Sequence, residues 1–442
     1  MPKRTDRVPA RLAMVAGVFL VWTPATHAQT QPPKPSARCV VAGAPQTLGD
    51  VLGRVAGSPR AEAIARELAA SEALETQAAA LPNPQLDLAM EDFAGTDNYA
   101  NYGQSQTTLS VAQRLELGGR RARRTEVAQR ETAVQRVRGE RQTLRAAAVA
   151  KQATVALLAA RARLAIRQDA RRLAEDALTQ AKRLAQSGAA SIVEADRATM
   201  ACATASLDLS AAERDVGVAE QRLAALWGDD APAAACITGD LTLPSTLTRE
   251  AARQRPPAVV MAEAEVDARK ADVELARAEA TPDVEVLAGV RHRTGPSDVS
   301  AVAGLGVEIP IFDRNNGNIA AAEQHLFAAQ AQAAWARRQS ESRAQQLRQT
   351  IAASRDRARR LQSEVIPAAE RAHASLLRAW RGGAASSLDV VDARRTLIGF
   401  RLDRIDALVD LHRAATSLED SLGVVSPHFE DISVAPSTPS QD

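Results

Sequence analysis

Residues 181–198 read AKRLAQSGAASIVEADRA, and residues 376–395 read LLRAWRGGAASSLDVVDARR. Each stretch contains a helical run, a short break at glycine and a second helical run. The phrase Gly-Ala-Ala-Ser occurs in both without a gap, at Gly188 and Gly383, which lie 195 residues apart. The chain is therefore predicted to contain two copies of one unit, each of which folds back at a glycine-centred tip.

The composition favours long helices over a thick aromatic core. Aromatic residues make up only 3% of the 442 residues, whereas alanine, arginine, glutamate, glutamine and leucine dominate. These residues have high helix propensity, and small side chains allow close contacts between helices. Helix is therefore expected outside a few special segments.

Residues 1–28 have the three-part layout of a secretory signal. Basic residues precede an apolar run over 12–22, and Thr26-His27-Ala28 forms a cleavage site. The run is shorter than the ~20 residues of a membrane-spanning helix, although a short buried helix would have the same hydropathy. We expect export from the cytoplasm and a Pro-rich linker over residues 29–44. The remaining chain is nearly neutral, so no nucleic-acid partner is expected.

The first repeat is expected over residues 45–228. Its helical periodicity stops at residues 81–84, and alternating apolar residues then predict strands at about 85–93 and 105–117. The strands have the length of tilted membrane strands, and the loop between them is rich in aromatic residues. A water-soluble hairpin would show the same alternation, so both interpretations stay open on this pattern. A long helix then runs to a tip at residues 187–191.

The second repeat is expected over residues 244–423. Its strands are predicted at about 283–291 and 300–312, and its tip at residues 382–386. Along the last strand one face is apolar and the other is small or polar, as in a barrel strand between lipid and lumen.

The parts that join and follow the repeats are also predicted. Residues 229–243 form a linker between the repeats, and residues 424–442 form a flexible polar tail. In the second repeat, one long helix is expected from Asn318 to Arg381, with a bend at Pro367.

Cys39 and Cys236 occupy similar places, because each precedes a Pro-x-Thr-Leu sequence at the start of a repeat. In an oxidising compartment they form a candidate disulfide, and two free thiols are the alternative. Cys202 lies within a helix and is interpreted as a small core residue.

The order helix, strand, strand, long helix, tip and helix, given twice, resembles the TolC family of outer-membrane efflux channels. Three phrases are similar to its heavy-metal, Czc-type branch. They are LPNPQL at residues 81–86, QRLELGGR at 113–120 and, as the most specific, IPIFDRNNGN at 309–318.

This resemblance implies a mainly α-helical fold with a membrane β-barrel portion. Each subunit of a homotrimer would give four strands to a twelve-stranded barrel and its helices to a periplasmic tunnel. Strand edges cannot stay unpaired in lipid, which agrees with an oligomer. The resemblance also implies a place in the outer membrane of a Gram-negative bacterium. The implied partners are outer-membrane lipid, a periplasmic adaptor protein and an inner-membrane pump of the RND type.

In this family the tips form the periplasmic entrance, where aspartates narrow the pore. Asp389 and Asp392 match that spacing and lie on one helix face, and Glu194 and Arg197 take their places in the first repeat. A ring of carboxylates would favour cations, whereas an ordinary solvated helix face is the alternative. The residues expected to contact the adaptor are Ser187, Gly188, Ala189, Ser191, Gly382, Gly383, Ala384 and Ser386.

Other functions find less support in the sequence. No phosphate-binding loop and no nucleophile and base pair indicate an enzyme or a cofactor, and the histidines lie too far apart to suggest a metal-ligand cluster. A periplasmic adaptor or coiled-coil scaffold would show one hairpin rather than two repeats with strands. Within the channel interpretation, export of divalent heavy-metal cations is expected, and multidrug efflux or type I secretion is the alternative.

Overall fold

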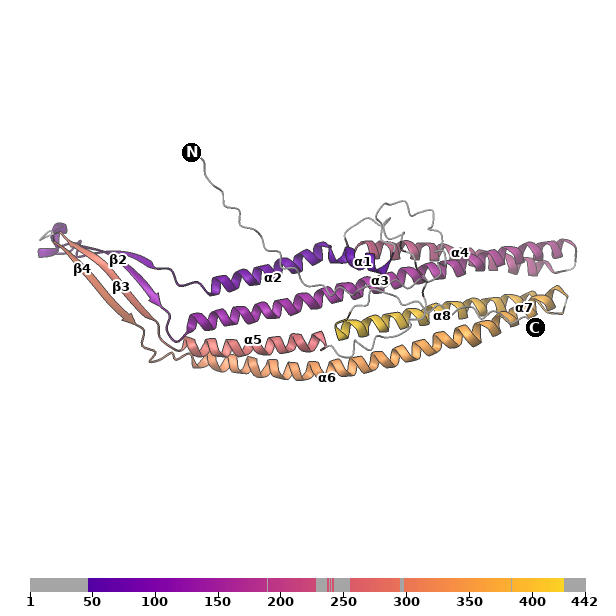
Figure 1. Ribbon diagram of the computed structural model, residues 1–442. Coiled ribbons are helices and arrows are strands. Elements are labelled where there is room, and N and C mark those ends of the chain that lie inside the picture. Colours follow the sequence, from indigo (N-terminus) through magenta and orange to yellow (C-terminus); the bar gives the residue numbers. More distant parts are fainter. Residues whose placement is uncertain are drawn as a thin grey trace, which may run out of the picture.

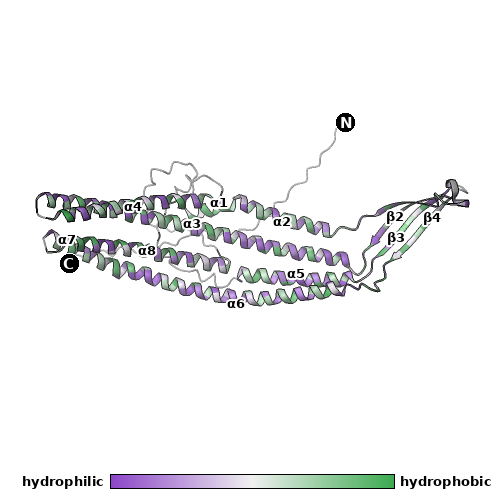
Figure 2. Ribbon diagram, turned by 180° about the vertical axis from the view of Figure 1, so that it is seen from behind, coloured by the Kyte–Doolittle hydropathy of each residue, from purple (hydrophilic) through white to green (hydrophobic). Residues whose placement is uncertain are grey.

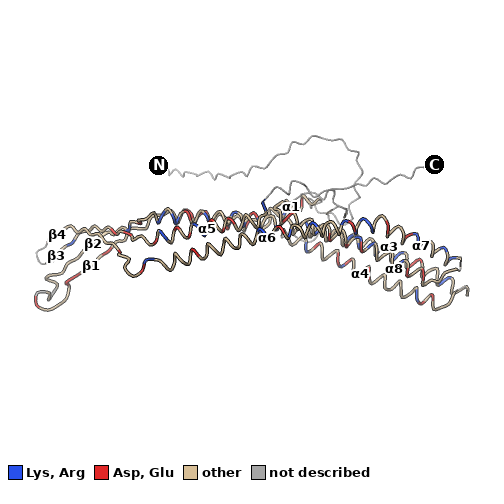
Figure 3. The backbone as a smooth tube through the Cα atoms, turned by 90° about the horizontal axis from the view of Figure 1, so that it is seen from below, with Lys and Arg blue, Asp and Glu red and all other residues tan. Residues whose placement is uncertain are grey.

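The computed structural model describes residues 47–188, 190–227, 237, 239, 241, 255–294, 298–382 and 384–424. Long helices form a rod, a four-stranded sheet extends from one end, and the two helical tips lie at the other end (Figure 1). The mainly α-helical fold with four strands per chain, which the resemblance implies, is confirmed. Along the rod each helix alternates hydrophilic and hydrophobic residues (Figure 2), and positive and negative residues are spread over its whole length (Figure 3).

The first half of the described chain runs from the rod into the sheet, back through the rod and around the first tip. Its elements are α1 (Leu48–Ala56), α2 (Pro59–Ala78), β1 (Gln85–Glu91), η1 (Asp97–Tyr102), β2 (Gln106–Leu115), α3 (Arg120–Gln186) and α4 (Ile192–Ala224). With 67 residues, α3 extends about 100 Å at 1.5 Å per residue. This one helix therefore connects the sheet to the tip.

The second half follows the same path. Its elements are α5 (Pro257–Glu279), β3 (Val284–Arg293), β4 (Asp298–Val307), α6 (Asn316–Arg360), η4 (Leu361–Val365), α7 (Ile366–Arg381) and α8 (Ser387–Leu422).

Local capping explains the break between α1 and α2. Thr47 and Asp50 form a capping box at the start of α1. Gly57 ends α1, and the Ser58 hydroxyl then accepts a hydrogen bond from the Ala61 amide, with Pro59 as the first residue of α2. A side-chain cap followed by proline is a strong helix start, so two helices form instead of one.

The helix expected to run unbroken to Arg381 is interrupted. Residues 361–365 form a π-helical turn between α6 and α7. Pro367, which follows this turn, has no amide hydrogen to donate to the preceding turn, and such a loss is accommodated by local widening. Leu361 at the turn is buried against Ala407 and Leu408 of α8, which keeps the helices packed there.

The sheet is antiparallel, with the strands in the order β1-β2-β3-β4. β4 is shorter than expected, because it ends at Val307 rather than near residue 312. Pro310 lacks the amide hydrogen that a strand ladder needs, so the chain leaves the sheet before it. β1 and β4 are the two edge strands.

The core of the rod is thin and is divided into separate clusters of small and aliphatic residues. One cluster joins Val51 of α1, Leu157 of α3 and Leu223 of α4, with Trp227 after α4. A second cluster joins Leu347 of α6 to α8. This arrangement agrees with a composition rich in alanine and poor in aromatic residues.

Candidate channel surfaces

One face of the sheet is mainly apolar across all four strands, with Thr107, Gln113 and His292 as its polar residues. The register pairs Leu88 with Leu109, Leu109 with Val290 and Val290 with Ala301, so these side chains form one row. Alternate residues of a strand point to the same face. The neighbouring rows on this face contain Leu86, Met90, Val111, Leu115, Val286, Ala288, Ala303, Leu305 and Val307. Leu88 and Leu305 are more than 70% exposed in the single chain, as residues of a membrane strand that face lipid would be.

The opposite face of the sheet carries charged and small residues. Arg114 lies opposite Glu285, and Arg293 lies opposite Asp298. The guanidinium of Arg291 donates to the Thr108 hydroxyl at 3.0 Å and lies 3.5 Å from a Glu91 carboxylate oxygen. Cross-strand pairs of opposite charge suit the aqueous side of a barrel wall.

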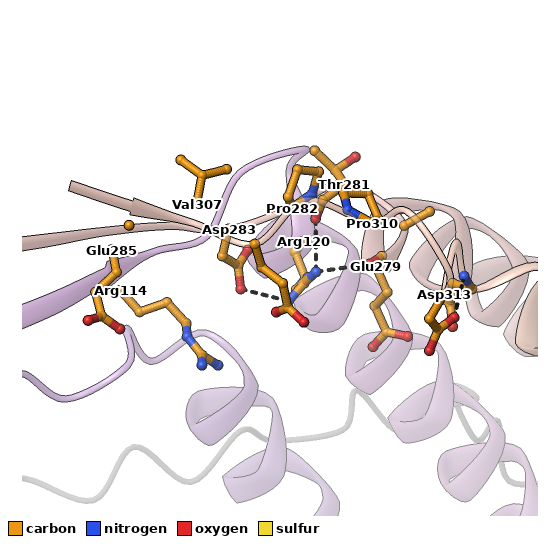
Figure 4. Close-up of a pocket in the computed structure, with 14 residues that line it drawn as sticks. Arg114, Arg120, Glu279, Thr281, Pro282, Asp283, Glu285, Val307, Pro310 and Asp313 are labelled. Atoms are coloured by element: carbon orange, nitrogen blue, oxygen red, sulfur yellow. Dashed lines mark hydrogen bonds and ion pairs between the residues drawn. The ribbon is translucent and has the colours of Figure 1, made fainter.

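A polar junction joins the sheet to the helices (Figure 4). Arg120, the first residue of α3, donates through Nη1 to Asp283 Oδ2 at 2.7 Å. Its Nη2 donates to the carbonyl oxygens of Glu279 and Thr281, both at 3.0 Å. One side chain of the first repeat therefore fixes the end of α5 and the start of β3 in the second repeat. A cavity of about 440 Å³ lies here.

Two glycines allow the chain to turn from β2 into α3. Gly118 and Gly119 have φ angles of +64° and +74°. A Cβ atom at Gly118 would lie 2.7 Å from Cβ of Thr281. Both the backbone conformation and the close approach of Thr281, in the link from α5 to β3, therefore require glycine at residue 118.

The phrase IPIFDRNNGN forms the link from β4 to α6. Asp313 accepts a hydrogen bond from the Asn315 amide at 2.9 Å, and Asn315 adopts a left-handed conformation with a φ of 60°. The Asn315 side chain donates to the carbonyl oxygen of Ala276 in α5 at 2.7 Å, and the side-chain Nδ2 of Asn318 donates to Asn315 Oδ1 at 2.6 Å. The most specific phrase of the sequence thus has a structural role at the junction.

At each tip a backbone amide after the break donates to a carbonyl oxygen of the preceding helix. In the first, Gly188 has a φ of +75°, and the Ala190 amide donates to the Leu184 carbonyl oxygen at 3.1 Å. In the second, the Ala384 amide donates to the Ala379 carbonyl oxygen at 2.8 Å. The exposed residues of the predicted docking set are Ser187, Gly188, Ser191, Gly382, Ala384 and Ser386. Ala189 and Gly383 lie outside the described residues.

Asp389 caps a helix at the second tip. Its carboxylate accepts hydrogen bonds from the Ser386 amide at 3.0 Å and hydroxyl at 2.8 Å, while the Ser386 hydroxyl accepts one from the Asp389 amide at 3.2 Å. These hydrogen bonds lower the pKa of Asp389 below its ordinary value, so the exposed carboxylate is ionised at neutral pH.

The other three residues predicted at the entrance lie on different surfaces. Asp392 is exposed on α8, three residues after Asp389. Glu194 and Arg197 of α4 line a cavity between two helical hairpins, one formed by α3 and α4 and the other by α7 and α8. Neither Asp389 nor Asp392 lines this cavity. Among the described side chains no ion pair joins Glu194 to Arg197. A single chain therefore does not bring all four residues to one site.

The cavity between the hairpins is a feature that the sequence did not predict. Its walls come from α3, α4, α7 and α8, and its volume is about 690 Å³. Arg394 lines it and is partly buried. The sequence around Arg394 contains many arginines, so no local signal distinguishes the one that packs between the hairpins.

Three other predictions concern residues that the structure does not describe. Cys39 and Cys236 of the predicted disulfide lie outside the described residues, and so do the signal and most of the tail. Cys202 is a free thiol, partly buried in α4.

Among the helices in the described segments, none is long and apolar enough to cross a membrane. Within the same segments, no group of three or more His, Cys, Asp and Glu residues is arranged to hold a metal ion.

Comparison with known proteins identifies relatives of the whole rod and sheet. The chain is 31% identical over 392 residues to the cobalt-zinc-cadmium resistance protein CzcC of Cupriavidus metallidurans, covering 86% of this chain and 91% of that protein. It is 32% identical over 275 residues to the nickel-cobalt-cadmium resistance protein NccC of Alcaligenes xylosoxydans, covering 60% of this chain and 61% of that protein.

A solved structure has the same fold. The outer membrane protein VceC of Vibrio cholerae superposes with a TM-score of 0.72 at 18% identity, covering 85% of this chain and 96% of that one. The profile of the outer membrane efflux protein family matches two segments, residues 56–229 and 248–424. Each matched segment contains its own strand pair and its own tip, and together the two segments extend over most of the chain. The chain belongs to the outer membrane efflux protein family.

Proposed function

We propose that three copies of this chain form the outer-membrane conduit of a tripartite pump that exports divalent heavy-metal cations. The conduit carries out no chemistry on its cargo and works by giving the cations a polar path through the membrane. A periplasmic adaptor and an inner-membrane pump of the RND type complete the assembly.

The metal cargo is supported by similarity of sequence. CzcC, whose name describes resistance to cobalt, zinc and cadmium, is 31% identical over most of both chains. NccC, named for nickel, cobalt and cadmium resistance, is 32% identical over a shorter part. The identity to CzcC over 86% of this chain is the observation that carries the proposal of a metal cargo.

The trimer is supported by the edges of the sheet. With the order β1-β2-β3-β4, both β1 and β4 have one side without a neighbour in the single chain. Unpaired backbone groups in hydrocarbon cost several kcal/mol each, as an order of magnitude. If β4 of each copy pairs with β1 of the next, three copies close a twelve-stranded barrel and remove these edges.

At the periplasmic end we propose that Asp389 and Asp392 face the pore. Both carboxylates are exposed on α8, so three copies would place six of them around the entrance. Such a ring attracts cations. The exposed tip residues Ser187, Gly188, Ser191, Gly382, Ala384 and Ser386 would contact the adaptor. Glu194 and Arg197 would lie beside this contact.

A deletion strain tests the cargo. It would be grown with Zn, Co, Cd, Ni, Cu or Ag salts and, in parallel, with hydrophobic drugs and bile salts, and its metal content would be measured. We expect sensitivity to one group of divalent metals together with raised cell metal, both reversed by a plasmid copy of the chain. Sensitivity to drugs alone would reject the metal cargo and favour multidrug efflux instead.

A further inference from the structure

The cavity between the hairpins lies close to both tips. Residues of the first hairpin that line it include Leu173 and Ala177 of α3, and those of the second hairpin include Leu377 and Trp380 of α7 and Val391 of α8. These five side chains form an apolar part of the cavity wall. Its volume of about 690 Å³ lies in the range of about 300–1,000 Å³ that is typical of small-molecule sites.

The charged residues of the cavity are mostly positive. Four arginines line it, Arg183, Arg197, Arg381 and Arg394, against two carboxylates, Asp176 and Glu194. Arg183, Arg197 and Arg381 are exposed and are well solvated, but Arg394 is partly buried on the cavity wall. The cavity is therefore complementary to a negative charge held next to an apolar body.

Arg394 has no carboxylate partner among the described residues. Burial lowers the pKa of its guanidinium, and the Cys202 thiol, rather than an Asp or Glu, opposes this effect. The pKa of His373 on the facing helix is also lowered, first by burial and then by the charges of Arg394 and Arg401. A buried cation without an anion is unfavourable, and several partly buried arginines elsewhere in the rod pair with a carboxylate, such as Arg167 with Asp208 at 2.7 Å.

We propose that the cavity binds an amphipathic monoanion, with its carboxylate on Arg394 and its hydrocarbon chain against Leu377, Trp380 and Val391. The planar guanidinium offers two parallel donors, which fits a carboxylate. The apolar walls remove the chain of the ligand from water. Because Leu173 and Ala177 of the first hairpin also line the cavity, a molecule that fills it would contact both repeats near the entrance.

Energy transfer from Trp380 to a dansyl group tests this proposal. The full-length protein in nanodiscs would be titrated with 11-(dansylamino)undecanoic acid. We expect saturable energy transfer, and a Trp380→Phe substitution should remove it. In that variant, direct excitation of the dansyl group measures whether the probe still binds. Arg394→Gln should weaken binding on the order of tenfold or more, because it removes a charge-assisted hydrogen bond.

Two controls isolate the charge. Arg395→Gln changes the adjacent, exposed arginine that does not line the cavity, and it should leave the affinity unchanged. The methyl ester of the probe keeps the hydrocarbon chain but carries no charge, and it should bind as weakly to the natural protein as the acid binds to Arg394→Gln. Three outcomes would each overturn the proposal. They are equal affinity for the acid and the ester, equal affinity of the Arg394→Gln and Arg395→Gln variants, and no saturable binding. In the absence of saturable binding, an acidic side chain of a docking protein would become the favoured partner of Arg394.

Discussion

Lys151 of α3 and Glu419 of α8 form an ion pair across the two repeats, with Nζ 2.8 and 3.0 Å from the carboxylate oxygens. Their side chains are only 6% and 15% exposed. Arg145 with Asp420 and Arg163 with Asp406 join the same two helices nearby. The ion pairs therefore hold α3 against α8 in the middle of the rod, whereas the cavity separates the hairpins nearer the tips.

Removal of one partner should destabilise the rod strongly. We expect Glu419→Gln to lower the free energy of unfolding by about 3–5 kcal/mol, because the buried ammonium of Lys151 loses its carboxylate. Denaturant unfolding followed by circular dichroism measures this loss. The exposed pair of Arg66 and Glu62 gives a control, since Glu62→Gln should cost less than about 1 kcal/mol. Equal effects of the two substitutions would contradict the role of burial.

Substitution of Gly118 should disturb the junction between sheet and helices. An alanine there must adopt a positive φ and meets Thr281 at 2.7 Å, so we expect a loss above about 1 kcal/mol. Gly217 in α4 has open space around it, and Gly217→Ala should raise stability by roughly 0.5–1 kcal/mol. Thermal unfolding of both variants in one detergent provides the comparison. A neutral Gly118→Ala would show that the turn can rearrange.

The sequence predicts the large features of this fold because they depend on periodicity. Two-residue alternation predicted four strands, and the repeat around Gly188 and Gly383 predicted two hairpins. The junction was also visible as the phrase IPIFDRNNGN, although its role as an asparagine-based helix start, through Asn315, emerged only from the structure. The π-helical turn was missed, since Pro367 predicts a bend but not the widening before it.

The surfaces at the entrance were less predictable. Ser386 and Asp389 form a capping box at the start of α8, a role that was not predicted from the sequence. Ser191 and Glu194 have the same spacing, yet Ser191 caps the Val193 amide and Glu194 lines the cavity. Which face of a helix packs against another hairpin depends on long-range contacts, so equivalent positions of the two repeats can differ.

The cap at the second tip should weaken in acid. The folded-state pKa of Asp389 lies below its ordinary value of 3.8, because Ser386 donates two hydrogen bonds to the ionised carboxylate. This contribution is fully present above pH 3.8 and is lost as the pH falls through the lower folded-state pKa. Hydrogen exchange of the first turn of α8, measured between pH 6 and about 2.5, should therefore accelerate relative to its intrinsic rate.

A serine pair provides the control for this pH effect. Ser386→Ala removes the hydroxyl donor but keeps the backbone amide of residue 386, so it should reduce the acid-dependent step, whereas Ser387→Ala, at the next position, should leave the step unchanged. An unchanged profile in Ser386→Ala would contradict the assignment of the capping box as its source.

The carboxylates proposed at the entrance should influence conduction differently. Asp389 is engaged by Ser386, while Asp392 makes no hydrogen bond or ion pair among the described residues. We expect Asp392→Asn to reduce block by multivalent cations in planar bilayers, and the double substitution with Asp389→Asn to weaken cation selectivity further. Asp410→Asn, farther along α8, is the matched control. Unchanged selectivity in the double variant would mean that these carboxylates do not face the pore.

The two faces of β4 should tolerate charge differently. Ala303 lies on the apolar face opposite Ala288, whereas Val302 lies on the polar face opposite Gly289. An arginine in contact with lipid near the middle of the membrane costs about 2–4 kcal/mol, but on the aqueous face its charge stays hydrated. We therefore expect Ala303→Arg to reduce the amount of folded protein in the outer membrane and Val302→Arg to leave most of it. Fractionation followed by heat-modifiable gel mobility measures both. The reverse order would mean that the other face of the sheet, which carries Arg114 and Glu285, is the one that contacts lipid.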